Sequence, residues 1–328
     1  MSTSPLHGAS SSAVGGAAGP RAGRPPRPTS LSRQSPRYGE RLALTGLAGA
    51  ALLSVLVTVG IVVALVVPAL EFFQTVSVVE FLTGTKWAPR FENQEAYGVL
   101  PLVTGTLWTT VISLAIAIPF GLGAAVYLSE YAPSGVRKVL KPVLELLAGI
   151  PSVVYGFFAL TFIAPVVLQQ ILSIEVGTFS VLAAGIALGI MIIPTVASLS
   201  EDAMSAVPNA LRQGSLALGA NRMRTTLRVV FPAAISGIAA SIVLGLSRAV
   251  GETMIVALAA GTQPRMVASP TELGQTMTGY IAQTATGEST PGTIGYDSLY
   301  AVGLLLFLLT LVINIISIRL VRKFREAY

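Results

Sequence analysis

The sequence predicts an all-α membrane protein with six transmembrane helices. Hydrophobic residues make up 53% of the chain and charged residues only 11%, whereas about 25% are charged in a typical soluble domain. A helix needs about 20 apolar residues to cross a bilayer. Six uncharged runs are long enough, and each is predicted to form one span: 42–70, 96–129, 146–174, 176–200, 229–247 and 298–318.

The distribution of basic residues predicts the orientation of these spans. Of the 21 lysines and arginines, only Lys86, Arg90 and Arg265 lie on one side of the spans, and Arg248 is placed within the fifth. All the others flank the spans on the opposite side. Because cytoplasmic flanks are enriched in Lys and Arg, both termini are predicted to be cytoplasmic. The positive charge is explained by topology, so no nucleic acid partner is needed.

The chain divides into a tail and a transmembrane domain. Residues 1–40 are rich in Ser, Gly, Pro and Arg without an apolar period, which predicts a disordered, basic cytoplasmic tail. Residues 41–328 form the transmembrane domain, with outer loops at 71–97 and 261–297 and a long cytoplasmic loop at 201–231. A short helix is predicted within the second outer loop, at 270–285.

The composition argues against an enzyme and against a metal site. Cysteine is absent and the single histidine, His7, lies in the tail. This removes disulfides, thiolate chemistry, histidine acid–base catalysis and most transition-metal sites. The phosphate-binding pattern Gly-x-x-x-x-Gly-Lys-[Ser/Thr] does not occur in the sequence, so ATP hydrolysis would require another polypeptide.

The cytoplasmic loop is predicted to form a helix, a glycine turn and a second helix. Pro208 is suited to a helix start, residues 209–218 have a helical pattern, and Gly219 suits a left-handed cap. Asn221 can cap a second helix that runs from residue 222 toward Pro232, which is predicted to start the next span.

Residues 213–219 and 229–232 resemble the EAA loop of ABC importer permeases. In that family Glu-Ala-Ala opens the motif, a glycine follows six residues after the Glu, and Leu-Pro closes it thirteen residues later. Gly219 and Pro232 match this frame, whereas the opening triplet is Gln213, Gly214 and Ser215 and Phe231 replaces Leu. The resemblance implies that these residues form a loop that couples the chain to an ATPase.

Three further segments, residues 145–156, 244–254 and 98–106, resemble phosphate-specific ABC importer permeases of the PstC type. The resemblance implies the type I permease fold in a bacterial plasma membrane and import of inorganic phosphate. It also implies a sister permease of the PstA type, two PstB-type ATPase subunits and an external PstS-type phosphate-binding protein. The chain itself would bind no cofactor, and the partner ATPase would use ATP and Mg²⁺.

Arg248 and Glu252 are the candidate translocation residues. They are four residues apart, which places both side chains on one face if the helix is continuous. A guanidinium can hold two phosphate oxygens at once, so Arg248 is predicted to contact phosphate in transit and Glu252 to compete for Arg248. The alternative is an ion pair that only fixes helix packing.

A proline and small residues at the start of the third run predict a kink and close helix packing, namely Gly149, Pro151, Ser152 and Gly156. Glu145 is predicted to lie at the cytoplasmic end of the third span, near Lys141.

Two other functions are left open at this stage. One is an ABC permease for another oxyanion, such as sulfate or molybdate. The other is a proton-coupled secondary transporter with Glu252 as the proton carrier, against which the single carboxylate at depth and the absence of inverted-repeat halves argue.

Overall fold

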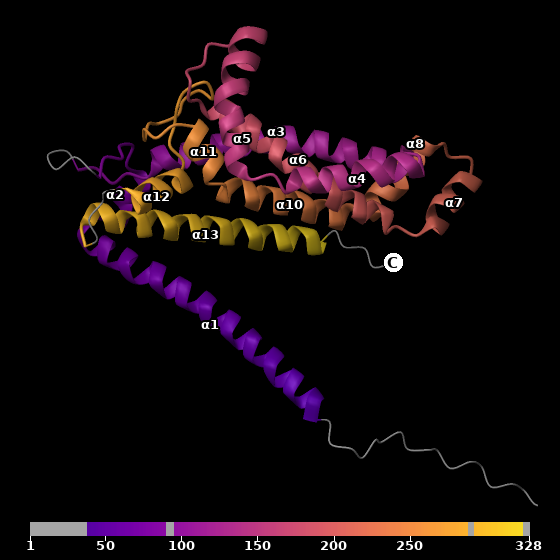
Figure 1. Cartoon of the computed structure of the whole chain (residues 1–328), viewed down its shortest axis with the longest axis horizontal. Coiled ribbons are helices and arrows are strands. Elements are labelled where there is room, and N and C mark those ends of the chain that lie inside the picture. Colours follow the sequence, from indigo (N-terminus) through magenta and orange to yellow (C-terminus); the bar gives the residue numbers. More distant parts are fainter. Residues whose placement is uncertain (1–37, 90–94, 288–291, 324–328) are drawn as a thin grey trace, which may run out of the picture. The chain divides into compact units, whose positions relative to one another are not determined.

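The computed structural model describes residues 38–89, 95–287 and 292–323 and forms two compact units, residues 1–55 and 56–328. The described part of the first unit is the beginning of α1, and all other elements belong to the second (Figure 1). The elements are α1 (Tyr38–Thr75), α2 (Val78–Thr83), α3 (Leu100–Val126), η1 (Tyr127–Tyr131), α4 (Ser134–Ala148), α5 (Ser152–Phe158), η2 (Ala159–Ile171), α6 (Val181–Ser205), α7 (Asn209–Ala217), α8 (Arg222–Thr225), η3 (Thr226–Val230), α9 (Phe231–Ala233), α10 (Ile235–Gly251), α11 (Met254–Ala259), α12 (Met277–Thr286) and α13 (Ile294–Lys323). The elements labelled η are π-helical turns.

The helices confirm the all-α membrane fold. Among the described residues, five helical segments are long and apolar enough to cross a membrane. Two further helical pieces, Arg222–Ala233 and Ile235–Gly251, meet at an angle of 71° and make a sixth when they are counted as one bent span. The bend follows Pro232, which lacks a backbone N–H and so weakens the helix at this point. Pro232 was predicted to start the fifth span, but it lies in α9 just before the bend.

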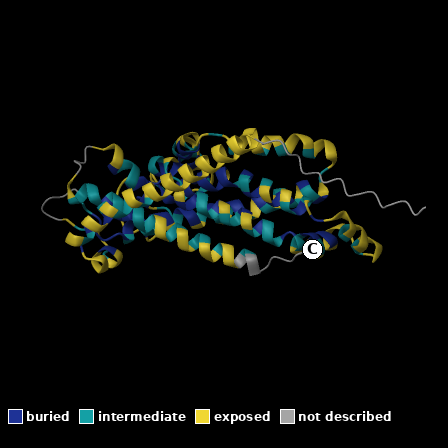
Figure 2. Cartoon of the chain, turned by 90° about the horizontal axis from the view of Figure 1, so that it is seen from below, coloured by how far each residue is buried: buried dark blue, intermediate teal, exposed yellow. Residues whose placement is uncertain are grey.

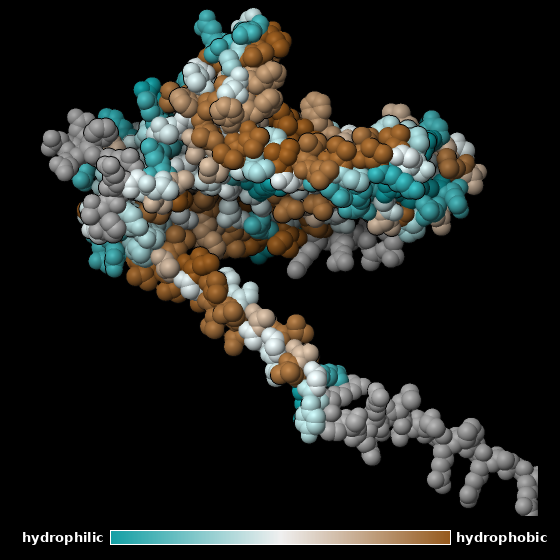
Figure 3. Space-filling model, in the orientation of Figure 1, coloured by the Kyte–Doolittle hydropathy of each residue, from teal (hydrophilic) through white to brown (hydrophobic). Residues whose placement is uncertain are grey.

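The second unit has its core around α6, which packs between α3 and α10. Figure 2 shows buried residues along the middle of the bundle and exposed residues outside it. Glycines permit the close approach of α3 and α6, because a Cβ at Gly185 would meet Ile112 and one at Gly189 would meet Ile116. On the face seen in Figure 3, apolar side chains cover much of the second unit, and hydrophilic ones gather toward its ends, including the end with α7 and α8. This distribution fits a lipid-facing bundle.

Gly105 of α3 offers a test of helix packing. A Cβ at this position would clash with the backbone carbonyl of Gln275, whereas one at Gly123 of the same helix would meet nothing within 4 Å. Gly105→Ala is therefore expected to destabilise the protein by about 1–3 kcal/mol, as overpacking does. Gly123→Ala, the matched control, should leave stability within about 1 kcal/mol of the original. Thermal unfolding in detergent measures both, and equal midpoints for the two variants would contradict the packing described.

Several predicted boundaries differ from the structure. Residues 1–37 lie outside the described part of the chain, but helix α1 already begins at Tyr38, so the last three residues of the predicted tail are helical. The first outer loop is also shorter than predicted, because α1 continues to Thr75. The loop contains α2 and an antiparallel bridge between Trp87 and Tyr97. Burial and the neighbouring Glu95 carboxylate raise the pKa of Tyr97.

The third span begins later than predicted. Residues 134–148 form the separate amphipathic helix α4, and α5 starts at Ser152. Glu145 therefore lies exposed on α4 rather than in the span, and Lys141 bonds to α6 instead of to Glu145. The predicted helix at 270–285 is α12, which begins only at Met277.

Candidate functional site

Arg248 lies in the last turn of α10 and is half-buried. Its Nη1 atom donates a hydrogen bond of 3.4 Å to the hydroxyl of Thr195 on α6. A cation is favoured at the C-terminus of a helix by the helix dipole. Within the described residues Arg248 forms no ion pair.

Glu252 does not share a helical face with Arg248, so that part of the prediction is wrong. Helix α10 ends at Gly251, and Glu252 has an extended backbone with φ −67° and ψ 133°. Its carboxylate accepts hydrogen bonds from the backbone N–H groups of Met254, at 3.0 Å, and Ile255, at 3.3 Å. These are unpaired donors at the start of α11. Glu252 thus caps α11.

The break between α10 and α11 is held by the second outer loop. Thr278 of α12 donates a hydrogen bond of 2.6 Å to the carbonyl oxygen of Glu252. The buried side chain of Gln275 donates one of 2.6 Å to Gln283. The hydroxyl of Thr278 therefore lies next to the break that follows Arg248.

The predicted kink at the start of the third run is a break between two helices. Gly149 follows the last residue of α4, and Pro151 immediately precedes Ser152, the first residue of α5. Gly156 lies against α11, because a Cβ there would be 2.9 Å from the Leu258 side chain. None of these four residues bonds to Arg248 in the described structure.

The loop predicted at 201–231 begins later than expected, because α6 continues to Ser205, and its second helix is the short α8 followed by the π-helical turn η3. The rest of the loop has the local structure that the sequence predicts. Helix α7 begins at Asn209 and carries Gln213, Gly214 and Ser215, and Gly219 has a left-handed φ of 83°. The Asn221 side chain caps α8 by accepting from the N–H of Arg224. Ser215 is hydrogen-bonded to Thr225 at 2.9 Å, which joins α7 to α8.

Two carboxylates that the sequence analysis missed form ion pairs between helices at the end of the bundle next to α7 and α8. Glu201 of α6 is fully buried and pairs with Arg137 and Lys141 of α4. Burial lowers the pKa of Lys141, but its hydrogen bonds to Asp202 and Glu201 outweigh this effect and raise the pKa overall. These pairs attach the amphipathic helix α4 to α6.

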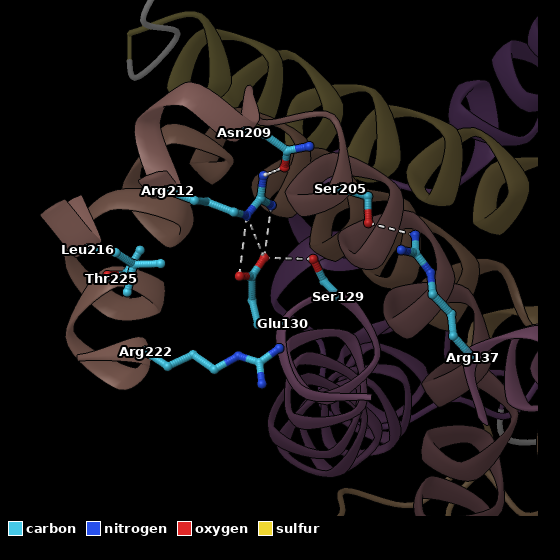
Figure 4. Close-up of a pocket in the computed structure, with 9 residues that line it drawn as sticks. All are labelled: Ser129, Glu130, Arg137, Ser205, Asn209, Arg212, Leu216, Arg222 and Thr225. Atoms are coloured by element: carbon cyan, nitrogen blue, oxygen red, sulfur yellow. Dashed lines mark hydrogen bonds and ion pairs between the residues drawn. The ribbon is translucent and has the colours of Figure 1, made fainter. Parts of the chain in front are cut away.

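The second carboxylate, Glu130 of η1, pairs with Arg212 of α7 at 2.9 Å. Figure 4 shows the two side chains pointing toward each other at the wall of a cavity of about 530 Å³. This cavity lies between η1, α7 and α8, because its lining includes Ser129, Leu216 and Arg222.

Comparison with known families identifies this architecture. The model of the binding-protein-dependent transport system inner membrane component matches residues 117–326. The chain belongs to that family. It is therefore the transmembrane permease subunit of an ABC importer, a multi-pass membrane protein. Permeases of this kind are not themselves ATPases, and they work with ATPase subunits and a substrate-binding protein.

Individual relatives indicate which type of ABC permease this chain resembles. A probable ABC transporter permease protein of Bacillus subtilis, YqgH, is 39% identical over 88% of this chain and 94% of its own length. A phosphate transport system permease protein of Mycobacterium tuberculosis, PstC 1, is 34% identical over 74% and 81%. The corresponding PstC protein of Haemophilus influenzae is 32% identical over 75% and 82%. The permease thus resembles the PstC type.

Solved structures of ABC importers have the same fold as this permease. A bacterial alginate ABC transporter crystallised with a pentasaccharide-bound periplasmic protein matches with a TM-score of 0.62 at 18% identity, over 88% of this chain and 98% of the other. The methionine transporter MetNI in an inward-facing conformation matches with a TM-score of 0.52 at 19% identity, over 70% and 95%. At these identities the comparison concerns the fold alone.

Proposed function

We propose that this permease passes inorganic phosphate into the cytoplasm as part of an ATP-driven importer. The phosphate transport permeases of the PstC type among its relatives support phosphate as the substrate. The proposed complex contains a PstA-type sister permease, two PstB-type ATPases and an external PstS-type phosphate-binding protein. ATP and Mg²⁺ are bound by the ATPases, and this chain binds no cofactor.

The proposal depends on the contacts that Arg248 makes in the structure. An arginine within a membrane span is costly, and such residues are usually paired or mark a pathway for ions. Arg248 bonds to the Thr195 hydroxyl, and no carboxylate in the described residues pairs with it. The other N–H donors of the guanidinium are therefore available to bind an oxyanion. Glu252 holds the adjacent break in shape by capping α11.

The loop that contains α7 and α8 is the proposed contact with the ATPase. Leu216, Leu218, Met223 and Leu227 are all more than half exposed on it. Exposed apolar residues grouped in this way are typical of a protein interface. This end of the bundle, rich in arginine, faces the cytoplasm in our proposal, as do both termini.

Uptake by proteoliposomes tests the choice of phosphate. Vesicles would contain the complete complex, with ATP inside and the binding protein outside, and radiolabelled phosphate, sulfate and molybdate would be offered separately. We expect phosphate to be imported at least about tenfold faster than the other two, a preference of about 1.4 kcal/mol. Faster import of sulfate or molybdate would favour the other oxyanion permease.

A further inference from the structure

Arg212 connects three parts of the chain through one guanidinium. It bonds to both carboxylate oxygens of Glu130, to the carbonyl oxygens of Met204 and Val207, at 2.7 and 2.6 Å, and to the side chain of Asn209. The two carbonyls lie at the C-terminal end of α6, where a helix leaves acceptors unpaired. Arg212 therefore joins α7 to both α6 and η1.

The position of the Glu130 carboxylate is fixed by its surroundings. Glu130 is 7% exposed, and the Ser129 hydroxyl donates a hydrogen bond of 2.9 Å to one of its oxygens. It lies in a π-helical turn, a feature that is frequent at functional sites. Since η1 continues α3 without a break, Glu130 is in the last turn of a span that begins at Leu100.

The next residue of η1 makes a second contact with the same loop. The guanidinium of Arg222, the first residue of α8, lies 5.2 Å from the ring centre of Tyr131. This distance is within the range of a cation–π interaction. We call the four residues Glu130, Tyr131, Arg212 and Arg222 the η1 clasp. Its two contacts join adjacent residues at the end of α3 to both helices of the loop, α7 and α8.

We propose that the η1 clasp makes α7, α8 and α3 move as one body, so that ATPase movement is passed into the span. The proposal rests on the function proposed above. From α3 the contacts continue to α6, where Val196 packs against Gly121, and from Thr195 of α6 to Arg248. Glu130 and Arg212 lie at the other end of the bundle from Arg248, the proposed phosphate contact. They act on transport by holding the loop in position, without touching the anion.

Glu130→Gln tests the clasp, because it removes the charge and keeps the shape of the side chain. In the reconstituted complex we expect ATP hydrolysis per complex within about twofold of the original and phosphate uptake per ATP lower by about tenfold or more. Backbone amides of α7 should exchange hydrogen faster by about tenfold. Glu145→Gln, an exposed carboxylate on α4, is the control and should change none of these quantities.

A reversible tether gives an independent test, because the chain has no cysteine of its own. In the double variant Glu130→Cys/Arg212→Cys, a bifunctional methanethiosulfonate reagent would join η1 to α7. If these elements move together, the tether restores uptake per ATP at least about fivefold over the untreated variant, and reduction removes the gain. If α7 must move relative to α3, the tether blocks transport instead, which overturns the proposal.

The remaining outcomes are also decisive. Unchanged uptake per ATP and unchanged exchange in Glu130→Gln would overturn the clasp, as would a loss of uptake that only follows loss of assembled complex. If the original complex imported none of the three oxyanions, the proposed function would fail. Hydrogen exchange of the α7 backbone amides in Glu130→Gln would then still show whether the clasp holds the loop.

Discussion

Arg248→Gln is expected to lower phosphate uptake by at least about 100-fold. Glutamine keeps a polar side chain in the span but has neither the charge nor the forked donors of the guanidinium. Two charge-assisted hydrogen bonds to the anion would be lost, each worth about 1.5–3 kcal/mol, and 1.4 kcal/mol corresponds to a factor of ten. Initial rates of radiolabelled phosphate uptake by the reconstituted complex measure the effect.

Two controls separate this role from a structural one. The amount of ATPase that co-purifies with Arg248→Gln should match the original, because Arg248 lies in the last turn of α10, at the opposite end of that helix from the loop with α7 and α8. Arg248→Lys keeps the charge without the fork and should retain intermediate uptake. Uptake by Arg248→Gln at the original rate would show that the guanidinium does not contact the transported anion.

Leu218→Asp is expected to weaken binding of the ATPase by at least about tenfold. Leu218 is 91% exposed at the turn between α7 and α8. Burying a leucine side chain at an interface contributes about 1.5–3 kcal/mol, and an unpaired carboxylate in its place adds a desolvation cost. The ATPase retained on the immobilised permease, or the dissociation constant of the purified components, gives the measurement.

Leu218→Met is the matched control, because methionine has a similar volume and remains apolar. It should bind the ATPase nearly as well as the original chain does. Equal binding by the Asp and Met variants would place the ATPase contact elsewhere on the permease.

Short-range features of this fold could be predicted because their causes are local. Gly219 adopts the left-handed conformation expected of a glycine after a helix, and Asn221 caps the helix that follows. The spans could be predicted because crossing a bilayer requires long apolar runs. The turn and the cap depend on neighbours within a few residues, and each span depends on one continuous run of the sequence.

The break after Arg248 was missed, although a signal for it exists. Gly251 weakens the helix, and Glu252 precedes by two and three residues the N–H groups that it caps. The four-residue spacing of Arg248 and Glu252 was interpreted as one face of a continuous helix instead. A capping interpretation of Gly251 and Glu252 would have placed the helix end correctly.

The clasp could not be predicted from one sequence. Glu130 and Arg212 are 82 residues apart, and neither belongs to a recognised pattern of charges. Glu201 falls directly after a predicted span, and nothing in the sequence pattern assigned it a role. Its burial depends on α4 folding back against α6, which supplies Arg137 and Lys141. Contacts of this kind are set by tertiary packing.

The energy source of transport tests the account most directly. Vesicles holding the two permeases alone and vesicles holding the complete complex would be compared for phosphate import, first with ATP inside and then with only a pH gradient. We expect import in the complete complex with ATP and none above background in the other three conditions. Import by the permeases alone, driven by the pH gradient, would show that the chain is a secondary transporter.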